Sequence, residues 1–436
     1  MVPHLATTLQ GPINELEQRI LDGMPAIERW LRLEWMEHTP PFYGAVDVRN
    51  AGFKLAPTGH DLFPSGWNHL SEEVLPLAVQ AGTAAIEKIC PEAKNLLIVP
   101  CNQAGEDVLH NSSYLSNLLQ LKRVFQLAGL NVRFGSINPH LNQAQTVVLP
   151  DGQSITLEPA LRSQRRLGLA HFDPCTILLN QPLASGVPGI LEELHEQNLL
   201  PPLHAANASR LNSRFLTAYD EIAKRFGKMI GIDPWLINPM HEVVPTLDVS
   251  RPDQLALLTE KVDALLGKIR RKYKDYGIHE QAWVELKCNS RRGQGGVLRL
   301  SQGAEVGPLL AQALAEHGDR INASAGVVLQ EAVMTQERVN DRLAQPVVYL
   351  MDRYVVGGFY KVQAHPVADA AWQVDTPSFL PLAFERSRHL PGPEYKPGAS
   401  VPNRFYMYGV VARLAMLAVS YELEATDPNL EVEGVV

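Results

Sequence analysis

Short apolar segments that alternate with helical patterns limit the fold of this chain more than any other feature of its sequence. NLLIVP (residues 95–100), NVRFGSI (131–137) and CTILLNQPL (175–183) have the composition of buried strands, and a helix is expected over 112–129. Continuous apolar strands joined by crossover helices are typical of a parallel sheet covered on both faces. TVVLPDGQSITLEP (146–159) alternates on both sides of Asp-Gly, which predicts a hairpin. We therefore predict a three-layer α/β fold for about the first 200 residues.

The pattern changes in the second half of the chain. Apolar runs at 283–288, 296–300, 326–333, 347–354 and 355–364 alternate as antiparallel strands do, and one helix is expected at about 304–316. Strands and helices segregated in this way are typical of the α+β class. The sequence therefore predicts α/β architecture followed by α+β architecture.

This change divides the chain into parts. We predict domains over 1–210 and 211–400, followed by a C-terminal helix and tail over 401–436. A length of 436 residues suits two or three domains, and 45% hydrophobic with 20% charged residues is ordinary globular composition.

Charge and cysteine content narrow the classes of function. A formal net charge of -8 disfavours nucleic-acid and membrane-surface binding, so an anionic ligand would need a local basic pocket. The four cysteines form no CxxC pair, which disfavours a zinc ribbon or a disulfide framework and favours a reducing compartment. The first 20 residues lack the pattern of a signal peptide, and no apolar run approaches the roughly 20 residues that cross a bilayer. We expect a cytoplasmic protein, and the oligomeric state is open.

A glycine-rich hairpin is predicted at WVELKCNSRRGQGGVLRL, residues 283–300. An alternating strand leads to Lys287, and the glycines of the turn, Gly293, Gly295 and Gly296, would allow backbone N–H groups to approach a phosphate. Lysine on a strand can contact the same phosphates as a point charge. The alternative is a solvated basic turn without chemistry.

Two later segments extend this pattern. GVVLQEAV places Gln330 and Glu331 at the end of a buried strand, where an adenine could be bound. PVVYLMDRYVVGGFYKVQAHP carries Asp352 and Arg353 in one apolar run and Lys361 in the next, with a turn expected at Gly357-Gly358. Acidic residues here would hold magnesium between nucleotide phosphates. Taken singly, Lys361 is more often a surface residue in such a pattern, and Asp352–Arg353 more often a structural ion pair. The order of these segments resembles the ATP-grasp architecture, in which two α+β subdomains clamp ATP.

Longer segments point to one family. VDVRNAGFKLAPTGHDLFPSGWNHL, PLAVQAGTAAIEKICPEAKNLLIVP, GIDPWLINP, VDALLGKIRRKYKDYGI, PVVYLMDRYVVGGFYKV and FLPLAFE resemble the proteobacterial-type glutamate–cysteine ligases, from about residue 3 to 390. The resemblance implies an N-terminal substrate-binding domain like those preceding ATP-grasp domains, then an ATP-grasp-like domain. It also implies formation of γ-glutamylcysteine from glutamate and cysteine with ATP and Mg²⁺, the first step of glutathione synthesis.

The resemblance also implies roles for individual residues. ATP would be bound by Lys287, Gly293, Gly295, Gly296, Gln330 and Glu331. Arg353 and Lys361 would be catalytic, stabilising the transferring phosphoryl group. Asp352 and Glu385 would hold the metal. Arg49, Asn50 and Lys54 would recognise a substrate carboxylate, because a guanidinium suits that geometry, although Arg49 could equally form a structural pair.

The chain departs from the family pattern where chemistry is expected. The family loop begins Lys-Ala-Asp-Ala-Gly and ends Gly-Met-Gly, whereas this loop reads KCNSRRGQGG. The Asn-rich metal segment of the family is replaced by one that offers Asp369, Asp375 and Glu385. Two alternatives therefore stay open: a paralogue that ligates another amino acid or amine, and an impaired nucleotide-binding or regulatory protein. Nucleic-acid binding through KIRRKYK is disfavoured, because this segment ends a helix predicted at about 252–275, and cations are ordinary at a helix C-terminus.

Overall fold

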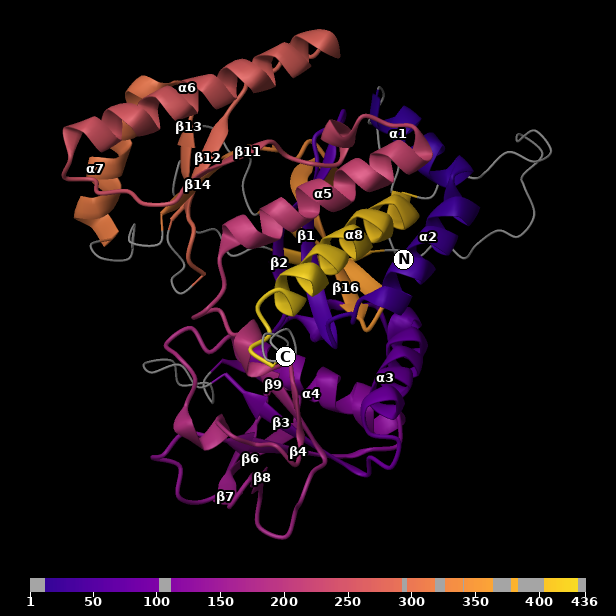
Figure 1. Ribbon diagram of the computed structural model, residues 1–436. Helices are drawn as coiled ribbons and strands as arrows, with labels where there is room; N and C mark the ends of the chain where they lie inside the picture. Colours follow the sequence, from indigo (N-terminus) through magenta and orange to yellow (C-terminus); the bar gives the residue numbers. More distant parts are fainter. Residues whose placement is uncertain are drawn as a thin grey trace, which may run out of the picture.

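The computed structural model describes residues 12–101, 111–291, 296–317, 326–339, 341–363, 378–382 and 404–429. Three main sheets and their covering helices make up the fold (Figure 1). The mixed α/β class predicted from the sequence is confirmed.

The sheet predicted from the first half of the chain has the strand order β10-β9-β3-β4-β6-β5. It comprises β3 (Asn95–Pro100), β4 (Asn131–Ser136), β5 (Gln145–Val148), β6 (Ser154–Pro159), β9 (Thr176–Asn180) and β10 (Asn198–Leu200). All neighbours pair in parallel except β5 and β6, which form the predicted hairpin. Helices α3 (Leu75–Ile89) and α4 (Ser112–Leu127) contribute to the core that the sheet shares. A short separate hairpin joins β7 (Leu161–Ser163) and β8 (Arg166–Gly168).

The central sheet combines strands from opposite ends of the chain. Its antiparallel order is β18-β17-β16-β1-β2, and β15 pairs with β16. The strands are β1 (Tyr43–Asn50), β2 (Leu55–Asp61), β15 (Arg338–Val339), β16 (Arg342–Met351), β17 (Tyr354–Val362) and β18 (Ser378–Pro381). The segment around residue 46 thus lies beside the segment around residue 348, as the Val46–Val348 register shows. This pairing spans both predicted domains, whose boundaries remain a prediction.

Helices α5 (Asn212–Ile230) and α8 (Arg404–Glu424) lie side by side against one face of the central sheet (Figure 1). Helices α1 (Pro12–Asp22) and α2 (Met24–Glu37) join the same core. Most of α8 is buried, and its internal Arg413 is neutralised by Glu28 of α2, with 2.7 Å between Nη2 and Oε1. No helix in the described ranges is both long and apolar enough to span a bilayer.

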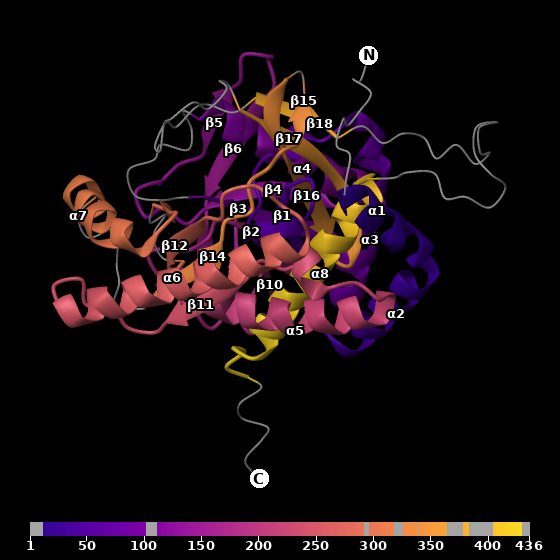
Figure 2. The same ribbon diagram turned by 90° about the horizontal axis from the view of Figure 1, so that it is seen from above.

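A third sheet, β11-β14-β12-β13, stands to one side with helices α6 (Pro252–Asp275) and α7 (Val306–His317), as Figure 2 shows from above. Its strands are β11 (His241–Val244), β12 (Val284–Cys288), β13 (Leu298–Leu300) and β14 (Val327–Glu331). The third sheet contains the predicted glycine-rich hairpin, as β12 and β13, and the strand predicted after it, as β14. Helix α6 spans the helix predicted at about 252–275. One-turn 3-10 helices occur at Trp67–His69, Glu72–Val74, Gly189–Leu191, Leu203–Ala205, Pro234–Leu236 and Gly303–Glu305.

The predicted turn at Gly357-Gly358 is wrong. The turn between β16 and β17 is made by Asp352 and Arg353, and Asp352 takes the left-handed conformation (φ 52°) that asparagine and aspartate tolerate best. Gly358 lies within β17 instead. A Cβ there would approach the carbonyl oxygen of Val347 to 2.5 Å, so close packing explains the glycine.

Candidate active site

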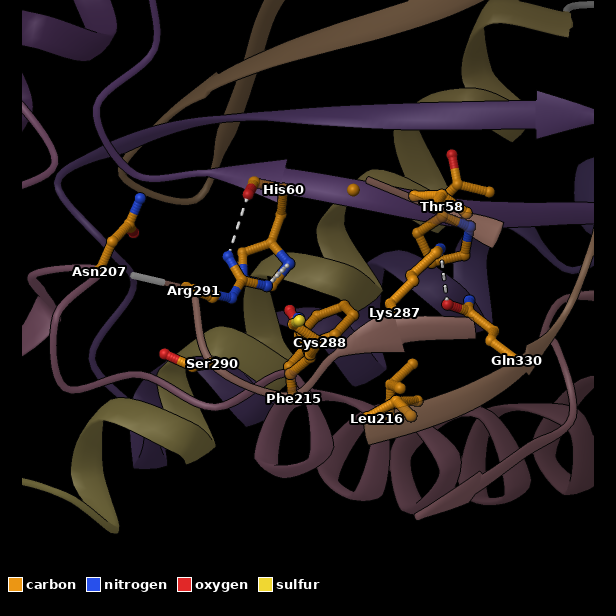
Figure 3. Close-up of a pocket in the computed structure, with 15 residues that line it drawn as sticks. Thr58, His60, Asn207, Phe215, Leu216, Lys287, Cys288, Ser290, Arg291 and Gln330 are labelled. Carbon is orange, nitrogen blue, oxygen red and sulfur yellow. Dashed lines mark hydrogen bonds between the residues drawn. The ribbon is translucent and has the colours of Figure 1, made fainter. Parts of the chain in front are cut away.

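A cavity of about 270 Å³ opens where the third sheet meets the central sheet and the start of α5. Strand β2 contributes Thr58 and His60, α5 contributes Phe215, and β12 and β14 contribute Lys287 and Gln330 (Figure 3). The cavity is therefore lined by segments that are far apart in the sequence.

Lys287 and Gln330 face this cavity together. The Lys287 Nζ lies 3.0 Å from Gln330 Oε1 and 2.8 Å from Glu285 Oε2, and the lysine side chain is 18% exposed. Strand alternation explains this, because residues 285 and 287 share one face of β12 and Gln330 lies directly opposite Glu285 on β14. Two of the predicted ATP-binding residues are thus brought to one site.

Three cations surround the carboxylate of Glu285. Besides Lys287, Arg49 approaches its Oε1 to 3.0 Å and Arg299 to 3.4 Å. Burial alone would raise the pKa of Glu285, but Lys287 and Arg49 outweigh burial and hold it well below its ordinary value. One carboxylate cannot neutralise three cations, so the cluster carries excess positive charge at the edge of the cavity.

Lys54 and Glu331 do not line this cavity. They bind each other, with 2.6 Å between Nζ and Oε2, and the Nε1 of Trp235 also donates to the carboxylate. Asn50 is equally internal, and its Oδ1 accepts from the backbone N–H of Gly52. Arg49 does not line the cavity either, and it is held by Glu285 and by the carbonyl oxygen of Val333 at 3.2 Å. In this structure each of these four side chains already has protein partners.

The glycine-rich turn is only partly described. Gly296 precedes β13 and is half-buried, whereas Gly293 and Gly295 lie outside the described residues. Glu385 also lies outside them, as do Asp369 and Asp375.

A second cavity, of about 320 Å³, lies on the central sheet toward α4. Lys361 lines it and forms an ion pair with Asp47, with 2.7 Å between Nζ and Oδ1. Asp61 also lines it; burial raises the pKa of this carboxyl group, and its Oδ1 accepts from the backbone N–H of Phe63. Both basic and acidic side chains thus line this cavity.

Asp352 and Arg353 lie in neither cavity. Asp352 Oδ1 lies 3.5 Å from Lys88 Nζ, and the Arg353 guanidinium lies 5.2 Å from the ring centre of Tyr354. Among the described residues no group of three or more His, Cys, Asp or Glu side chains could hold a metal ion. The described residues therefore do not fit a protein-built Mg²⁺ site at Asp352.

The family model described as glutamate-cysteine ligase matches residues 17–423. The chain belongs to the glutamate–cysteine ligase family. It is a ligase, and the activity of this family is to join glutamate to cysteine. Among solved structures, a candidate gamma-glutamylcysteine synthetase from Methylobacillus flagellatus KT is 44% identical, with a TM-score of 0.87 over 98% of this chain and 100% of that chain.

A second solved structure, D-alanyl-alanine synthetase A from Vibrio cholerae O1, is 11% identical with a TM-score of 0.33, over 74% of this chain and 81% of that chain. That likeness is too weak to carry an argument. No curated protein sequence matches the chain.

This glutamate–cysteine ligase family member has site residues that the sequence did not reveal. His60 and Arg291 line the first cavity, Asp61 lines the second, and Glu285 binds Lys287 of the first. Glu285 could have been found, since it lies two residues before Lys287 on the same strand face. His60 and Arg291 carried no such signal, because only the folded chain brings them together.

Proposed function

We propose that the protein joins L-glutamate to L-cysteine at the expense of ATP. The γ-carboxylate oxygen of glutamate attacks the terminal phosphorus of ATP, and the bond to the bridging oxygen breaks to release ADP. The cysteine amine then attacks the acyl carbon of γ-glutamyl phosphate. Phosphate leaves, the amine loses a proton, and the amide of γ-glutamylcysteine remains.

Excess positive charge beside the first cavity carries this proposal. The nucleotide and the acyl phosphate are strongly anionic, whereas the whole chain has a net charge of -8. Lys287, Arg49 and Arg299 around Glu285 supply the local basic site that such a ligand requires. Lys287 is the member of this cluster that lines the cavity itself.

The arrangement of the sheets supports ATP-grasp-like binding. The first cavity lies between the third sheet, with its helices α6 and α7, and the central sheet. In our proposal these two α+β units hold the nucleotide between them, and Gln330 at the end of β14 contacts the adenine. The proposed partners are small molecules in the cytoplasm: glutamate, cysteine and ATP.

We assign the second cavity to the amino-acid substrates. Lys361 could neutralise a carboxylate or the transferring phosphoryl group there, and Asp47 could receive an ammonium group. ATP is supplied in solution as its Mg²⁺ complex. Because the described residues do not form a metal site, no step of the proposal depends on how the protein contacts Mg²⁺.

The test is release of phosphate from ATP and Mg²⁺ in the presence of L-glutamate, with and without L-cysteine. We expect cysteine-dependent release that Lys287→Met reduces at least about 100-fold. The matched control is Lys228→Met, since Lys228 is exposed on α5 and should leave the rate unchanged. Release that depends on a different amine would identify a paralogue. Absence of release with every amino acid tested would reject the proposed activity.

A further inference from the structure

Two arginines flank His60, one of the residues that line the first cavity. Arg291 contacts His60 twice, through Nη1 to the carbonyl oxygen at 3.2 Å and through Nη2 to the ring Nδ1 at 3.1 Å (Figure 3). On the other side of the ring, Arg210 Nη2 lies 2.8 Å from His60 Nε2. Arg210 is held in turn by both carboxylate oxygens of Glu422 on α8.

Hydrogen-bond donors outnumber acceptors in this cluster. A neutral imidazole accepts at only one ring nitrogen, and a guanidinium never accepts. His60 can therefore satisfy only one of the two arginines through its ring. In addition, Arg210 Nη1 and Arg291 Nε are buried, and within the described part of the chain neither has a hydrogen-bond partner. Arg210 is only 3% exposed, so bulk water cannot supply the missing hydrogen-bond acceptors.

The positive charge is also in excess. Glu422 neutralises Arg210, but in the described ranges no carboxylate lies within ion-pair distance of Arg291. Burial and the neighbouring charge of Arg210 lower the pKa of Arg291 to about 9. Burial is the largest cause that holds the pKa of His60 well below its ordinary value, and the charges of Arg291 and Arg210 add to it, so the ring is neutral. Arg291 thus lacks a negatively charged hydrogen-bond acceptor of its own. Glu422 and Asp61 act on it only from beyond ion-pair distance.

Arg291 and His60 both line the cavity, together with Thr58, Asn212, Lys287 and Ser290. An anion bound in this cavity would therefore lie beside the guanidinium of Arg291, which has no carboxylate within ion-pair distance in the described ranges. We propose that Arg291 forms an oxyanion subsite, which binds a phosphoryl or carboxylate group of the ligand in this cavity. The subsite rests on the proposed function and deepens it, because it adds a second anchor to the one at Lys287.

Glu422 and Arg210 are positioning residues in this proposal. They hold the His60 ring from behind, and His60 in turn orients Arg291 toward the cavity. The C-terminal helix α8 thereby becomes part of the site, although Glu422 is itself buried and does not line the cavity.

Direct binding tests the subsite independently of catalysis. The wild type, Arg291→Gln, Arg291→Lys and the control Arg271→Gln, at an exposed position on α6, are titrated calorimetrically with ADP, adenosine, inorganic phosphate and L-glutamate. If the subsite binds a phosphoryl group, Arg291→Gln should lower the affinity for ADP and for phosphate at least about tenfold and leave the affinity for adenosine unchanged. If the subsite binds a carboxylate, only the affinity for L-glutamate should fall. Arg291→Lys should show a smaller loss than Arg291→Gln, and Arg271→Gln should bind every ligand as the wild type does.

Folding of the variants is checked by their unfolding temperatures without ligand. Because Arg291 has no carboxylate partner in the described structure, Arg291→Gln should unfold no earlier than the wild type. If it fails to fold, Arg291→Lys carries the test, with a smaller loss expected. Unchanged binding of all anions in folded variants overturns the subsite, and so does a wild type that binds none of them. Cysteine-dependent turnover with unaltered anion binding in Arg291→Gln would reject the subsite alone and leave the proposed activity standing.

Discussion

Lys54 and Glu331 form an ion pair that is closed to solvent, with the side chains 0% and 1% exposed and 2.6 Å between Nζ and Oε2. Lys54 lies in the short segment directly before β2 of the central sheet, and Glu331 is the last residue of β14 in the third sheet. The pair therefore connects the two sheets. Trp235 completes it, since the lysine Nζ lies 4.2 Å from the indole ring centre. The pair has the geometry of a structural connection between sheets.

We therefore expect Lys54→Met to act on stability. Removing one partner leaves the other charge buried and unpaired, which costs about 3–5 kcal/mol in the free energy of unfolding. The double variant Lys54→Met/Glu331→Gln should recover part of this loss. Urea denaturation of the three proteins measures both quantities. If Lys54→Met instead unfolds like the wild type but loses affinity for glutamate, Lys54 is a substrate ligand, as the sequence first predicted.

Arg353, in the turn of the β16–β17 hairpin, should tolerate substitution better than Lys361, which lies near the far end of β17. Arg353 is exposed at the turn and lines neither cavity, whereas Lys361 lines the second one. We expect Arg353→Ala to keep kcat/KM within about twofold, as surface substitutions do. Lys361→Met should lower it about 100-fold, the loss typical of a group that stabilises transition-state charge. Steady-state kinetics decides, and equal losses would return Arg353 to the catalytic set.

The extent to which sequence could predict the structure follows from how far apart the interacting residues lie in the chain. Parallel strands, the glycine-rich hairpin and helix α6 depend on local periodicity, so they were predictable. The pairing of β1 with β16 was not, because side-chain alternation does not identify a partner some 300 residues away.

The same reason explains the candidate site. Lys287 and Gln330 could be associated because they lie on adjacent antiparallel strands of one motif. The contacts that join His60, Arg210 and Glu422 link three distant segments, and only packing of α8 against the sheet makes them neighbours. The protein partners of Arg49 and Lys54 were hidden for the same reason, since each lies more than 200 residues away.

Glu285 should make the protein sensitive to acid. Its pKa in the folded chain lies below the ordinary value of 4.5, because Lys287, Arg49 and Arg299 favour the carboxylate. The unfolded chain binds the proton more readily, so Glu285 contributes stability above pH 4.5 and loses it as the pH falls further. Glu285→Gln removes this contribution and leaves three cations without their carboxylate, at a cost of about 3 kcal/mol at pH 7.

The measurement is the free energy of unfolding of the wild type and Glu285→Gln from pH 7 to pH 3. The difference between the two proteins should shrink below pH 4.5. Glu305→Gln is a useful comparison, because Glu305 is bound by Ser301 and not by a group of cations. A constant difference across this range would show that the cation cluster does not hold Glu285 ionised.

Cys90 and Cys175 should form a disulfide on mild oxidation. Cys90 directly follows α3 and Cys175 directly precedes β9, and their Sγ atoms lie 2.6 Å apart although the two residues are 85 positions apart in the chain. The pair was invisible in the sequence, where no CxxC motif marks it. Contact with Cys175, together with burial, raises the pKa of Cys90 to about 11, so little of its thiolate is present at neutral pH. Since the thiolate is the reactive form, oxidation should be slow at pH 7 and faster at pH 9.

Treatment with diamide, which takes up the two electrons and two protons, should reduce the thiols titrated after denaturation from four to two. The cross-link should raise the free energy of unfolding by about 2–4 kcal/mol, because it restricts the unfolded chain. Cys90→Ser is the control, which should keep all three of its thiols and gain no stability. If the wild type also keeps its four thiols at pH 9, the two sulfur atoms do not reach bonding geometry in solution.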